Sequence, residues 1–353
     1  MQLVAYGAQD IYLTGNPQIT FFKVVYRRHT NFAMESVAQT FEGSVAAGAC
    51  VSATISRNGD LVHRVYLESN KVESQADLLD YVELEIGGQL IDRQYGDWMG
   101  IWVELTHSTT KKGQYDALAT NSISSWLPLQ FSFCRNPGLA IPLIALQYHE
   151  VKLNFRFKTL VTGGAVCLWC DYIYLDTDER RRFAQTSHEY LIEQVQSNRG
   201  NTLNHGCVTK VPLTFNHPVK ELVWQAKDAS GDAIHINDEA TPTSGACCLK
   251  LNGHERFSKR VSNYFSRVQK YQHHSGVVAS GTANGADDKV HVYSFALQPE
   301  EHQPSGTCNF SRIDNAVLEV TNEKSTAKCL DVYAVNYNVL RVMSGMGGLA
   351  YSN

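Results

Sequence analysis

Alternating apolar and polar residues mark several segments of the chain as β-strands. In the segment from Val151 to Phe157 every odd position is apolar and every even position is polar. Only an extended strand places two such sets on opposite faces, because successive side chains point to opposite sides. Similar patterns occur at 81–86, 290–297 and 316–320, where β-branched and aromatic residues are frequent. The chain is therefore predicted to be mainly β.

Two short segments instead have the spacing of an amphipathic helix, with apolar residues three or four positions apart. These residues are Trp98, Ile101, Trp102 and Leu105 in the first segment and Val261, Phe265, Val268 and Tyr271 in the second. We expect one short helix in each half of the chain.

The order of these features occurs twice. Each half runs from a strand through glycine into the helix, and then through a second strand and a loop to an alternating strand. These elements lie at 81–86, 98–105, 129–133 and 151–157 in the first half and at 247–251, 261–271, 293–297 and 316–320 in the second. The offset is nearly constant, since 166 residues separate Gly87 from Gly253 and 164 separate Leu129 from Tyr293. Similar alternation buries similar faces, so two similar folds are expected.

Many short strands with long, turn-rich connections are typical of jelly rolls. We therefore predict an all-β chain of two tandem jelly-roll β-sandwiches, a double jelly roll, with short helices in the loops. The predicted parts are an N-terminal arm at 1–40, the first jelly roll at 41–182, a connector at 183–205 and the second jelly roll at 206–353. Two polar stretches rich in Gly and Ser, 227–246 and 275–288, are expected to project from one end of the second sandwich.

Composition and charge argue against several classes of protein. Hydrophobic residues make up 43% and charged residues 19% of the 353 residues, which is a globular composition. The formal net charge of -4 gives no general attraction to nucleic acid, so no direct contact with nucleic acid is expected. The basic run 180–182 directly follows acidic residues and is interpreted as a solvated connector. No apolar run reaches the roughly 18–20 residues of a membrane span, and no signal peptide is evident, so folding in the cytosol is expected.

The cysteines do not indicate disulfides or a metal site. There are nine, an odd number without regular spacing. Cys167 and Cys170 have the spacing of half a zinc site, but a strand would point them to opposite faces, and no second pair supplies further ligands. The adjacent pairs Cys247-Cys248 and His273-His274 also lack further ligands. We expect reduced, mostly buried thiols.

Three His-Glu dipeptides, at His149, His188 and His254, do not form a metalloprotease motif. Such a helix needs a second His four residues after the first. Those positions hold Leu153, Ile192 and Ser258. The acidic run 176–179 lacks the glycine and the later Glu of a calcium-binding loop, and it is interpreted as a charged connector.

The segment 345–350 fits the pattern GxGxxA, but only three residues follow it, so it cannot open the helix of a dinucleotide site. We interpret it as a flexible tail that tucks against a neighbour. No catalytic, cofactor-binding or metal-binding residue is predicted, no cofactor is expected, and the chain is not expected to be an enzyme.

Six segments of the chain together resemble one family. They are DIYLTGNPQITFFKVVYRRHTNF (10–32), DRQYGDW (92–98), NPGLAIPLIALQYHEV (136–151), NHPVKEL (216–222), PSGTCNFSRIDN (304–315) and NYNVLR (336–341). In this order they resemble the major capsid proteins of nucleocytoplasmic large DNA viruses, the group of the iridoviruses, phycodnaviruses and mimiviruses. The segments are distributed over nearly the whole chain.

The resemblance implies a double jelly roll, a homotrimeric capsomer of pseudo-hexagonal outline and an icosahedral shell over an internal membrane. The implied partners are other copies of the chain, within a trimer and between trimers, together with minor capsid proteins, penton proteins and the viral membrane. The implied location is the virion, with assembly in the host cytoplasm. The chain is short for the family, and this leaves a minor capsid role of the same fold as an alternative.

Two readings of other classes are also considered. A carbohydrate-binding β-sandwich shares this architecture, and the chain has 17 Tyr and 5 Trp, but most of these aromatics fall in patterns that predict core. A jelly-roll metalloenzyme of the cupin type needs clustered His-x-His spacing, which the sequence lacks.

The predicted arm carries an apolar run with basic residues around it. Its apolar residues include Phe21, Phe22 and Val24, with too few polar neighbours for a free surface strand, so we expect it beneath or beside the first jelly roll. Two hypotheses remain open for its basic residues. They face inward, toward membrane lipid or minor shell proteins, or they cap the domain. These residues are Lys23, Arg27, Arg28 and His29.

Overall fold

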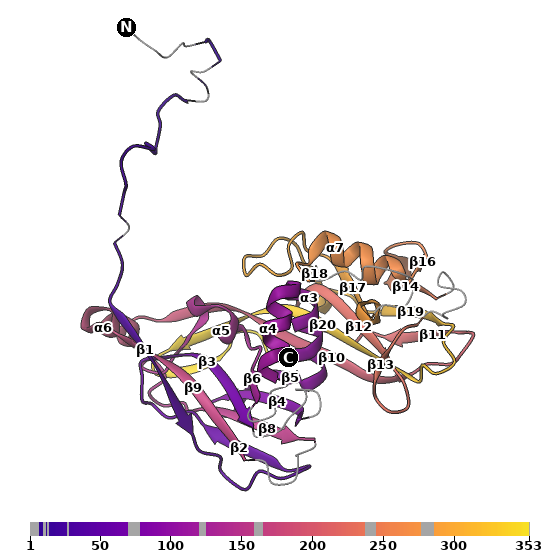
Figure 1. Ribbon diagram of the computed structural model, residues 1–353, viewed down its shortest axis with the longest axis horizontal. Helices are drawn as coiled ribbons and strands as arrows, with labels where there is room; N and C mark the ends of the chain where they lie inside the picture. Colours follow the sequence, from indigo (N-terminus) through magenta and orange to yellow (C-terminus); the bar gives the residue numbers. More distant parts are fainter. Residues whose placement is uncertain are drawn as a thin grey trace.

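The computed structural model describes residues 7–9, 12, 14–26, 28–69, 78–119, 125–158, 165–236, 245–276 and 286–352. These residues form four antiparallel sheets arranged as two sandwiches, with short helices between strands (Figure 1). The prediction of an all-β double jelly roll is confirmed.

The first sandwich is built from two sheets that face each other. The strands of one sheet are, in order, β1 (Phe32–Gln39), β9 (Val166–Leu175), β3 (Leu61–Ser69) and β6 (Ser125–Pro128), with β7 (Ile141–Pro142) also paired to β3. Those of the other are β2 (Cys50–Thr54), β8 (Val151–Phe157), β4 (Leu79–Ile86) and β5 (Gln89–Tyr95).

The second sandwich has the same plan. One sheet contains β10 (His188–Thr202), β20 (Cys329–Met343) and β12 (Pro218–Lys227), with β13 (Ala233–Ile234), β17 (Val290–Ser294) and β18 (Cys308–Asn309) on β12 and β21 (Met346–Leu349) on β20. The other contains β11 (Cys207–Pro212), β19 (Ala316–Asn322) and β14 (Ala246–Leu251), with β15 (His254–Glu255) and β16 (Arg260–Val261) on β14.

The two sandwiches correspond strand for strand. β3 lies between β9 and β6 as β12 lies between β20 and β17, and β8 lies between β2 and β4 as β19 lies between β11 and β14. Even a β-bulge recurs, since the register shifts between Val62 and Arg64 in β3 and between Val219 and Glu221 in β12. The repeat predicted from the sequence pattern is therefore present in the pairing of the strands.

The helices lie in the connections. They are α3 (Gly96–Thr106), α4 (Thr109–Ala119), α5 (Ser132–Arg135), α6 (Thr177–Gln185) and α7 (Gln269–His273), with a π-helical turn η2 (Tyr264–Val268) and the short turns η1 (Pro137–Leu139), η3 (Ala286–Lys289) and η4 (Phe310–Arg312). α3 and the continuous η2–α7 segment confirm the two predicted helices.

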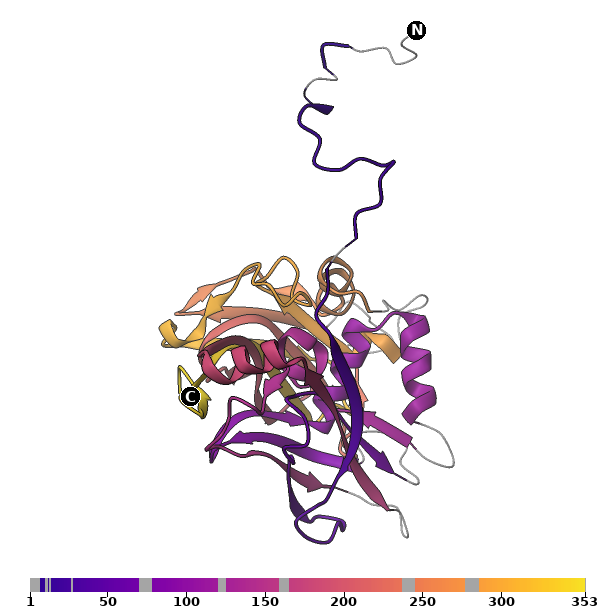
Figure 2. The ribbon, with the colours of Figure 1, turned by 90° about the vertical axis from the view of Figure 1, so that its left-hand side faces the viewer.

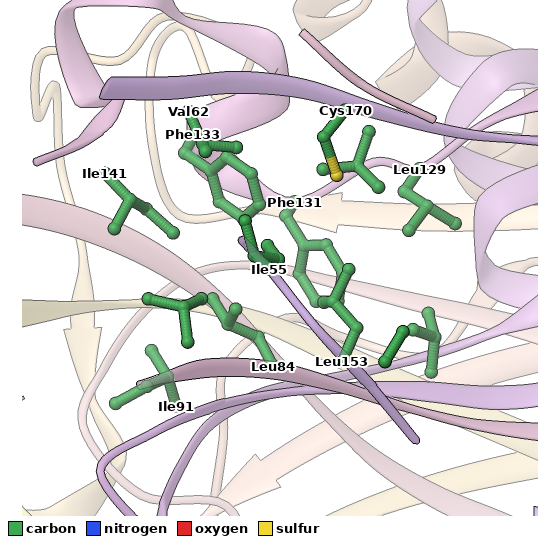
Figure 3. Close-up of a cluster of buried hydrophobic side chains, with 14 of the residues drawn as sticks. Ile55, Val62, Leu84, Ile91, Leu129, Phe131, Phe133, Ile141, Leu153 and Cys170 are labelled. Carbon is green, nitrogen blue, oxygen red and sulfur yellow. The ribbon is translucent and has the colours of Figure 1, made fainter. Parts of the chain in front are cut away.

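Each sandwich encloses its own apolar core. In the first, Figure 3 shows Phe131 and Phe133 among aliphatic side chains from both sheets, and their rings stack with centroids 5.7 Å apart. In the second, Trp224 packs on Phe265 with ring centroids 5.2 Å apart. Full burial of an aromatic side chain contributes about 1.5–3 kcal/mol, so these cores supply most of the driving force for folding.

The predicted strand at 129–133 is wrong. β6 ends at Pro128 and α5 begins at Ser132, although Leu129, Phe131 and Phe133 are all buried. The apolar residues of this turn and of the helical turn that follows it all pack in the core, so their alternation with Gln130 and Ser132 in the sequence resembles that of a strand. The strand predicted at 290–297 ends earlier, at Ser294.

The predicted arm and connector each contain the first strand of a sandwich. β1 pairs along its length with β9, and β10 pairs with β20. Neither shows clear alternation, for opposite reasons. β1 is an edge strand that is mostly exposed, whereas the middle of β10 is buried on both faces, including Glu193 and Gln194. Residues 188–202 of the predicted connector thus form a strand of the second sandwich.

Two further predictions concern the ends of the chain. The described residues before β1 extend away from the body rather than beneath or beside the first jelly roll (Figure 2), and Phe21 and Phe22 are more than nine-tenths exposed. At the other end, the expected flexible tail is ordered, because β21 pairs with β20 through a turn in which Ser344 and Gly345 have positive φ. The polar loops 227–246 and 275–288 lie partly outside the described residues.

Candidate assembly interface

The two sandwiches meet where α3 covers the outer face of the β10–β20–β12–β17 sheet. α3 has the apolar face that the sequence predicts, and the sheet presents a matching patch. The buried residues of this contact are Trp98, Ile101, Trp102 and Leu105 from α3 and Val195, Val223, Val290, Val292, Tyr333 and Val335 from the sheet. Trp98 lies at its centre, with its ring 5.3 Å from that of Tyr333. The helix thus covers a sheet face of the other sandwich.

A group of charged residues borders this apolar contact at one end. Nζ of Lys227 lies 2.8 Å from Oδ2 of Asp331 and also contacts Asp97, at the start of α3. Nη2 of Arg199 lies 3.1 Å from Oδ2 of Asp97, and its guanidinium stacks 4.2 Å from the ring centroid of Tyr95. Burial alone would lower the pKa of Lys227, but the two carboxylates outweigh it and raise that pKa. Lys227 is therefore held as a cation between two acids.

A second charged group lies at the other end, at the bulge of β12. The carboxylate of Glu193 forms two ion pairs, with Nζ of Lys220 at 2.7 Å from Oε1 and with Nη2 of Arg135 at 3.0 Å from Oε2. Lys220 is completely buried, and Arg135 stacks 4.2 Å from the ring centroid of Trp102. Lys220 lies in the bulge, between Val219 and Glu221, so the network depends on the local register of β12.

His274 completes this network from the end of α7. Its Nε2 lies 2.9 Å from Oε2 of Glu221, and its Nδ1 lies 3.1 Å from Oε1 of Glu300. Burial alone would lower the pKa of His274, but the two carboxylates raise it to about 9. The imidazolium form is therefore the one that this site holds at neutral pH. Burial of a paired ion costs desolvation and favours one geometry, so this network holds the end of α7 against β12 and reaches the first sandwich through Arg135.

A third contact joins the two helices directly. Nζ of Lys270, on α7, lies 2.8 Å from Oε1 of Glu104 on α3, and the Lys270 side chain is completely buried. Next to it, the backbone N–H of Gly276 donates to the carbonyl of Leu105 at 2.7 Å. The end of α3 is therefore held by the loop of the second sandwich.

The sequence candidates for chemistry are separated or have structural roles. Cys167 is exposed and Cys170 buried on the same strand, as the alternation predicts, and burial raises the pKa of Cys170. Asp176 caps α6 by accepting from the N–H of Thr177 at 2.8 Å. Among the described residues, no three side chains of the metal-binding types are grouped closely enough to hold an ion.

The three histidines of the His-Glu dipeptides also lie apart. His149 contacts the backbone of Gly347 through Nδ1, the Nε2 atom of His188 lies 2.9 Å from the carbonyl oxygen of Phe183, and His254 is exposed on β15. No sequence pattern singles out Glu193, Lys220, Glu221 or His274 as members of a site. Their one signal is the charged pair within the otherwise apolar β12 strand, which is unusual for a buried segment.

Several apolar side chains remain exposed on the single chain. Beyond the arm, the most exposed are Tyr148, Tyr271 and Leu297, between 74% and 79%. Large exposed apolar groups mark surfaces that contact other molecules. In the described part of the chain, no helix has the length and apolar character to span a bilayer.

Comparison with known proteins agrees with this architecture over the whole chain. The family model for the N-terminus of major capsid proteins matches residues 20–178, and that described as large eukaryotic DNA virus major capsid protein matches residues 179–348. The boundary between the two models lies in α6.

Individual relatives are similar over their full length. The major capsid protein of Pyramimonas orientalis virus is 52% identical, and that of Paramecium bursaria Chlorella virus 1 is 42% identical, each alignment covering 100% of this chain and 99% of the relative. The first alignment spans 400 positions, so the relative carries insertions that this chain lacks.

Solved structures show the same likeness. A crystal structure of PBCV-1 VP54, fitted into a reconstruction of the virophage Sputnik, has a TM-score of 0.84 and 38% identity, covering 95% of this chain and 100% of that one. The Faustovirus major capsid protein, at 12% identity, shares the fold with a TM-score of 0.71, covering 96% of this chain and 94% of that one. The chain therefore belongs to the family of major capsid proteins of large eukaryotic DNA viruses, structural components of the virion capsid.

Proposed function

We propose that three copies of this chain form a homotrimeric capsomer with a pseudo-hexagonal outline, and that many such trimers tile the facets of an icosahedral shell. The observation that supports this proposal is the strand-for-strand repeat of the two sandwiches. Three chains with two similar wedges each give six similar wedges about one axis. Closed rings are the common form of homo-oligomers, and a trimer turns a twofold repeat into a hexagonal outline.

The parts of the chain divide accordingly. We assign the arm to the residues before β1, the first jelly roll to β1 through β9, the connector to α6, and the second jelly roll to β10 through β21. This division moves all three predicted boundaries toward the N-terminus, so that each sandwich keeps its first strand. It also agrees with the sheets, since β1 and β10 occupy corresponding places beside β9 and β20.

The partners that fit this role are neighbouring trimers, minor capsid proteins and penton proteins, with the internal viral membrane beneath the shell. The net charge of -4 supports a shell that does not hold the genome directly. Assembly would take place in the host cytoplasm, where nine free cysteines stay reduced.

Solution mass is the direct test of the capsomer. Light scattering on purified protein should give three times the chain mass of 39.4 kDa, and electron microscopy should show particles with a hexagonal outline. A stable monomer at high protein concentration would contradict the trimer. In purified virions the chain should be the most abundant protein, whereas a minor capsid role would give a weak band.

A further inference from the structure

The helix of the second sandwich exposes a face that its counterpart in the first sandwich buries. α3 follows β5 and precedes β6, and the η2–α7 segment follows β16 and precedes β17. An offset of 166 residues matches Met99 with Phe265, and both are completely buried in the core of their own sandwich. The equivalence of the two helices is therefore supported by packing as well as by sequence order.

The same offset matches Trp102 with Val268 and Leu105 with Tyr271. Trp102 and Leu105 are 5% and 0% exposed because they lie on the second sandwich, whereas Val268 and Tyr271 are 41% and 79% exposed. Tyr264, which corresponds to Trp98, lies at the edge of this face and is half-buried, with the guanidinium of Arg260 4.3 Å from its ring centroid. This face is buried in one copy of the repeat and exposed in the other. The exposed helix face therefore has no sheet of its own chain to cover it.

The sheet that would receive it is identified by the two bulges. When the bulge of β3 is matched with that of β12, Tyr66 corresponds to Val223, and its partner Trp169 corresponds to Tyr333. Val223 and Tyr333 form the patch that α3 covers. The equivalent place on the first sandwich therefore presents an aromatic pair on its outer face.

This pair is well suited to an apolar contact. The rings of Tyr66 and Trp169 lie side by side, 6.5 Å apart and inclined by 11°. Their polar atoms are already bonded within the chain, because Nε1 of Trp169 donates to Glu68 at 2.8 Å and the Tyr66 hydroxyl bonds to Ser36 at 2.8 Å. Ring faces without unmet polar groups can be covered at little desolvation cost. On β6, Trp126 and Pro128 extend the surface at the positions of Val290 and Val292.

We propose that the helix face of one chain, formed by Tyr264, Val268 and Tyr271, packs on the sheet face of a second copy, formed by Tyr66 and Trp169. This proposal rests on the trimer proposed above and names its contact. It repeats between chains the contact that α3 makes within each chain. In Figure 1, β1 and β9 lie at the left of the body and α7 lies along its upper edge, so the two elements are well separated within one chain.

Such a contact is head-to-tail, because the two surfaces differ, and a head-to-tail contact forms a ring when its rotation closes. A trimer would then hold six versions of one helix-on-sheet contact, half of them inside chains and half between chains. The contact inside the chain is already fully formed in the single chain.

The test uses two variants of the full chain. The first, Val268→Glu with Tyr271→Glu, damages only the helix face. The second, Trp169→Lys, damages only the sheet face and places a cation beside Glu68. Each alone should be folded, with the circular dichroism of the wild type, and should have the mass of one chain. The matched control is Tyr148→Glu, which changes a tyrosine of similar exposure, 76%, outside both faces, and it should remain trimeric.

Mixing the two variants distinguishes a head-to-tail contact from any other. The intact sheet of the first variant can receive the intact helix of the second, but the resulting pair has no further intact faces. Sedimentation of the mixture should therefore show a species of two chains and none of three. Trimers that persist in either single variant, or variants that do not pair when mixed, would overturn the proposed contact. A monomeric wild type would instead reject the trimer itself.

Discussion

Nε2 of His274 lies 2.9 Å from Oε2 of Glu221, and both side chains are completely buried. Glu221 comes from the bulge of β12 and His274 from the end of α7, so the pair fixes the helix end against the sheet. Glu300 contacts the other ring nitrogen, and Lys220 and Arg135 lie near the carboxylate of Glu221. An ion pair within such a network makes the stability of the second sandwich depend on pH.

Replacing His274 with Gln should remove that dependence. The pKa of His274 is raised from 6.5 to about 9, so its contribution is complete below pH 6.5 and is lost as the pH rises through 9. The advantage of the wild type over His274→Gln should therefore shrink by about 3 kcal/mol across this range. Urea unfolding of the wild type and of His274→Gln, below pH 6.5 and above pH 9, measures this difference in stability. His254→Gln, an exposed histidine, is the control. An unchanged advantage would mean that His274 is neutral throughout.

The carboxylate of Glu193 should contribute far more than a surface acid on the same strand. Glu193→Gln removes the anion that pairs with Lys220 and Arg135, leaving a completely buried cation with less compensation. The expected loss is about 3 kcal/mol in the free energy of unfolding. Glu189→Gln provides the matched control on β10, because Glu189 is 58% exposed and its pair with Arg341 should contribute less than about 1 kcal/mol. Equal losses in the two variants would contradict this account.

Replacing each of two glycines at the junction with alanine should change the stability of the chain in opposite directions. At Gly100, in the interior of α3, an added Cβ meets nothing within 4 Å, so Gly100→Ala should stabilise the chain by about 0.5–1 kcal/mol through helix propensity. At Gly276 a Cβ would overlap the carbonyl oxygens of Glu104 and Leu105. Gly276→Ala should destabilise by about 1–3 kcal/mol, because the loop must move off α3. Thermal unfolding of both variants measures the two signs, and a neutral Gly276→Ala would show that this loop is not held on α3.

The alternation of apolar and polar residues predicts the strands that have one face in water. It does not predict the strands whose two faces are both covered. The segment from Val151 to Phe157 alternates because only one of its faces packs in the core. β10 and β12 lie beneath α3, so their outer residues are buried as well, and their burial no longer follows the period of two. Helix α4 is largely exposed and polar, and no apolar period marks it.

For a related reason, the sequence predicts only one side of the candidate interface, the apolar face of α3. The apolar spacing of Trp98, Trp102 and Leu105 shows that α3 has a face to bury, but spacing does not show which sheet it covers. The pairing of Glu221 with His274 depends on contacts between distant segments, which a local pattern does not contain. The expectation that the chain is not an enzyme is confirmed by its membership of a structural capsid family.

Deletion of residues 1–30 distinguishes the two hypotheses for the arm, in which its basic residues either contact membrane lipid or minor shell proteins or cap the domain. The described residues of this segment contact the body little, and Tyr12, Phe21, Phe22, Val24, Val25 and Tyr26 are between 74% and 97% exposed. Of the basic residues, Lys23, Arg28 and His29 are also exposed, and Arg27 lies outside the described residues. Because β1 begins only at Phe32, both sandwiches should fold without the arm.

The truncated chain should therefore form normal trimers by light scattering, with unfolding within about 1 kcal/mol of the wild type, as expected when few buried contacts are lost. If the arm binds membrane lipid or minor shell proteins, these trimers should fail to form shells when the other virion proteins are present. Replacing Lys23 and Arg28 with Glu in the full chain should reproduce the failure, because it reverses the charge and leaves the apolar residues in place. Insoluble monomers after truncation would instead show that the arm caps the first sandwich.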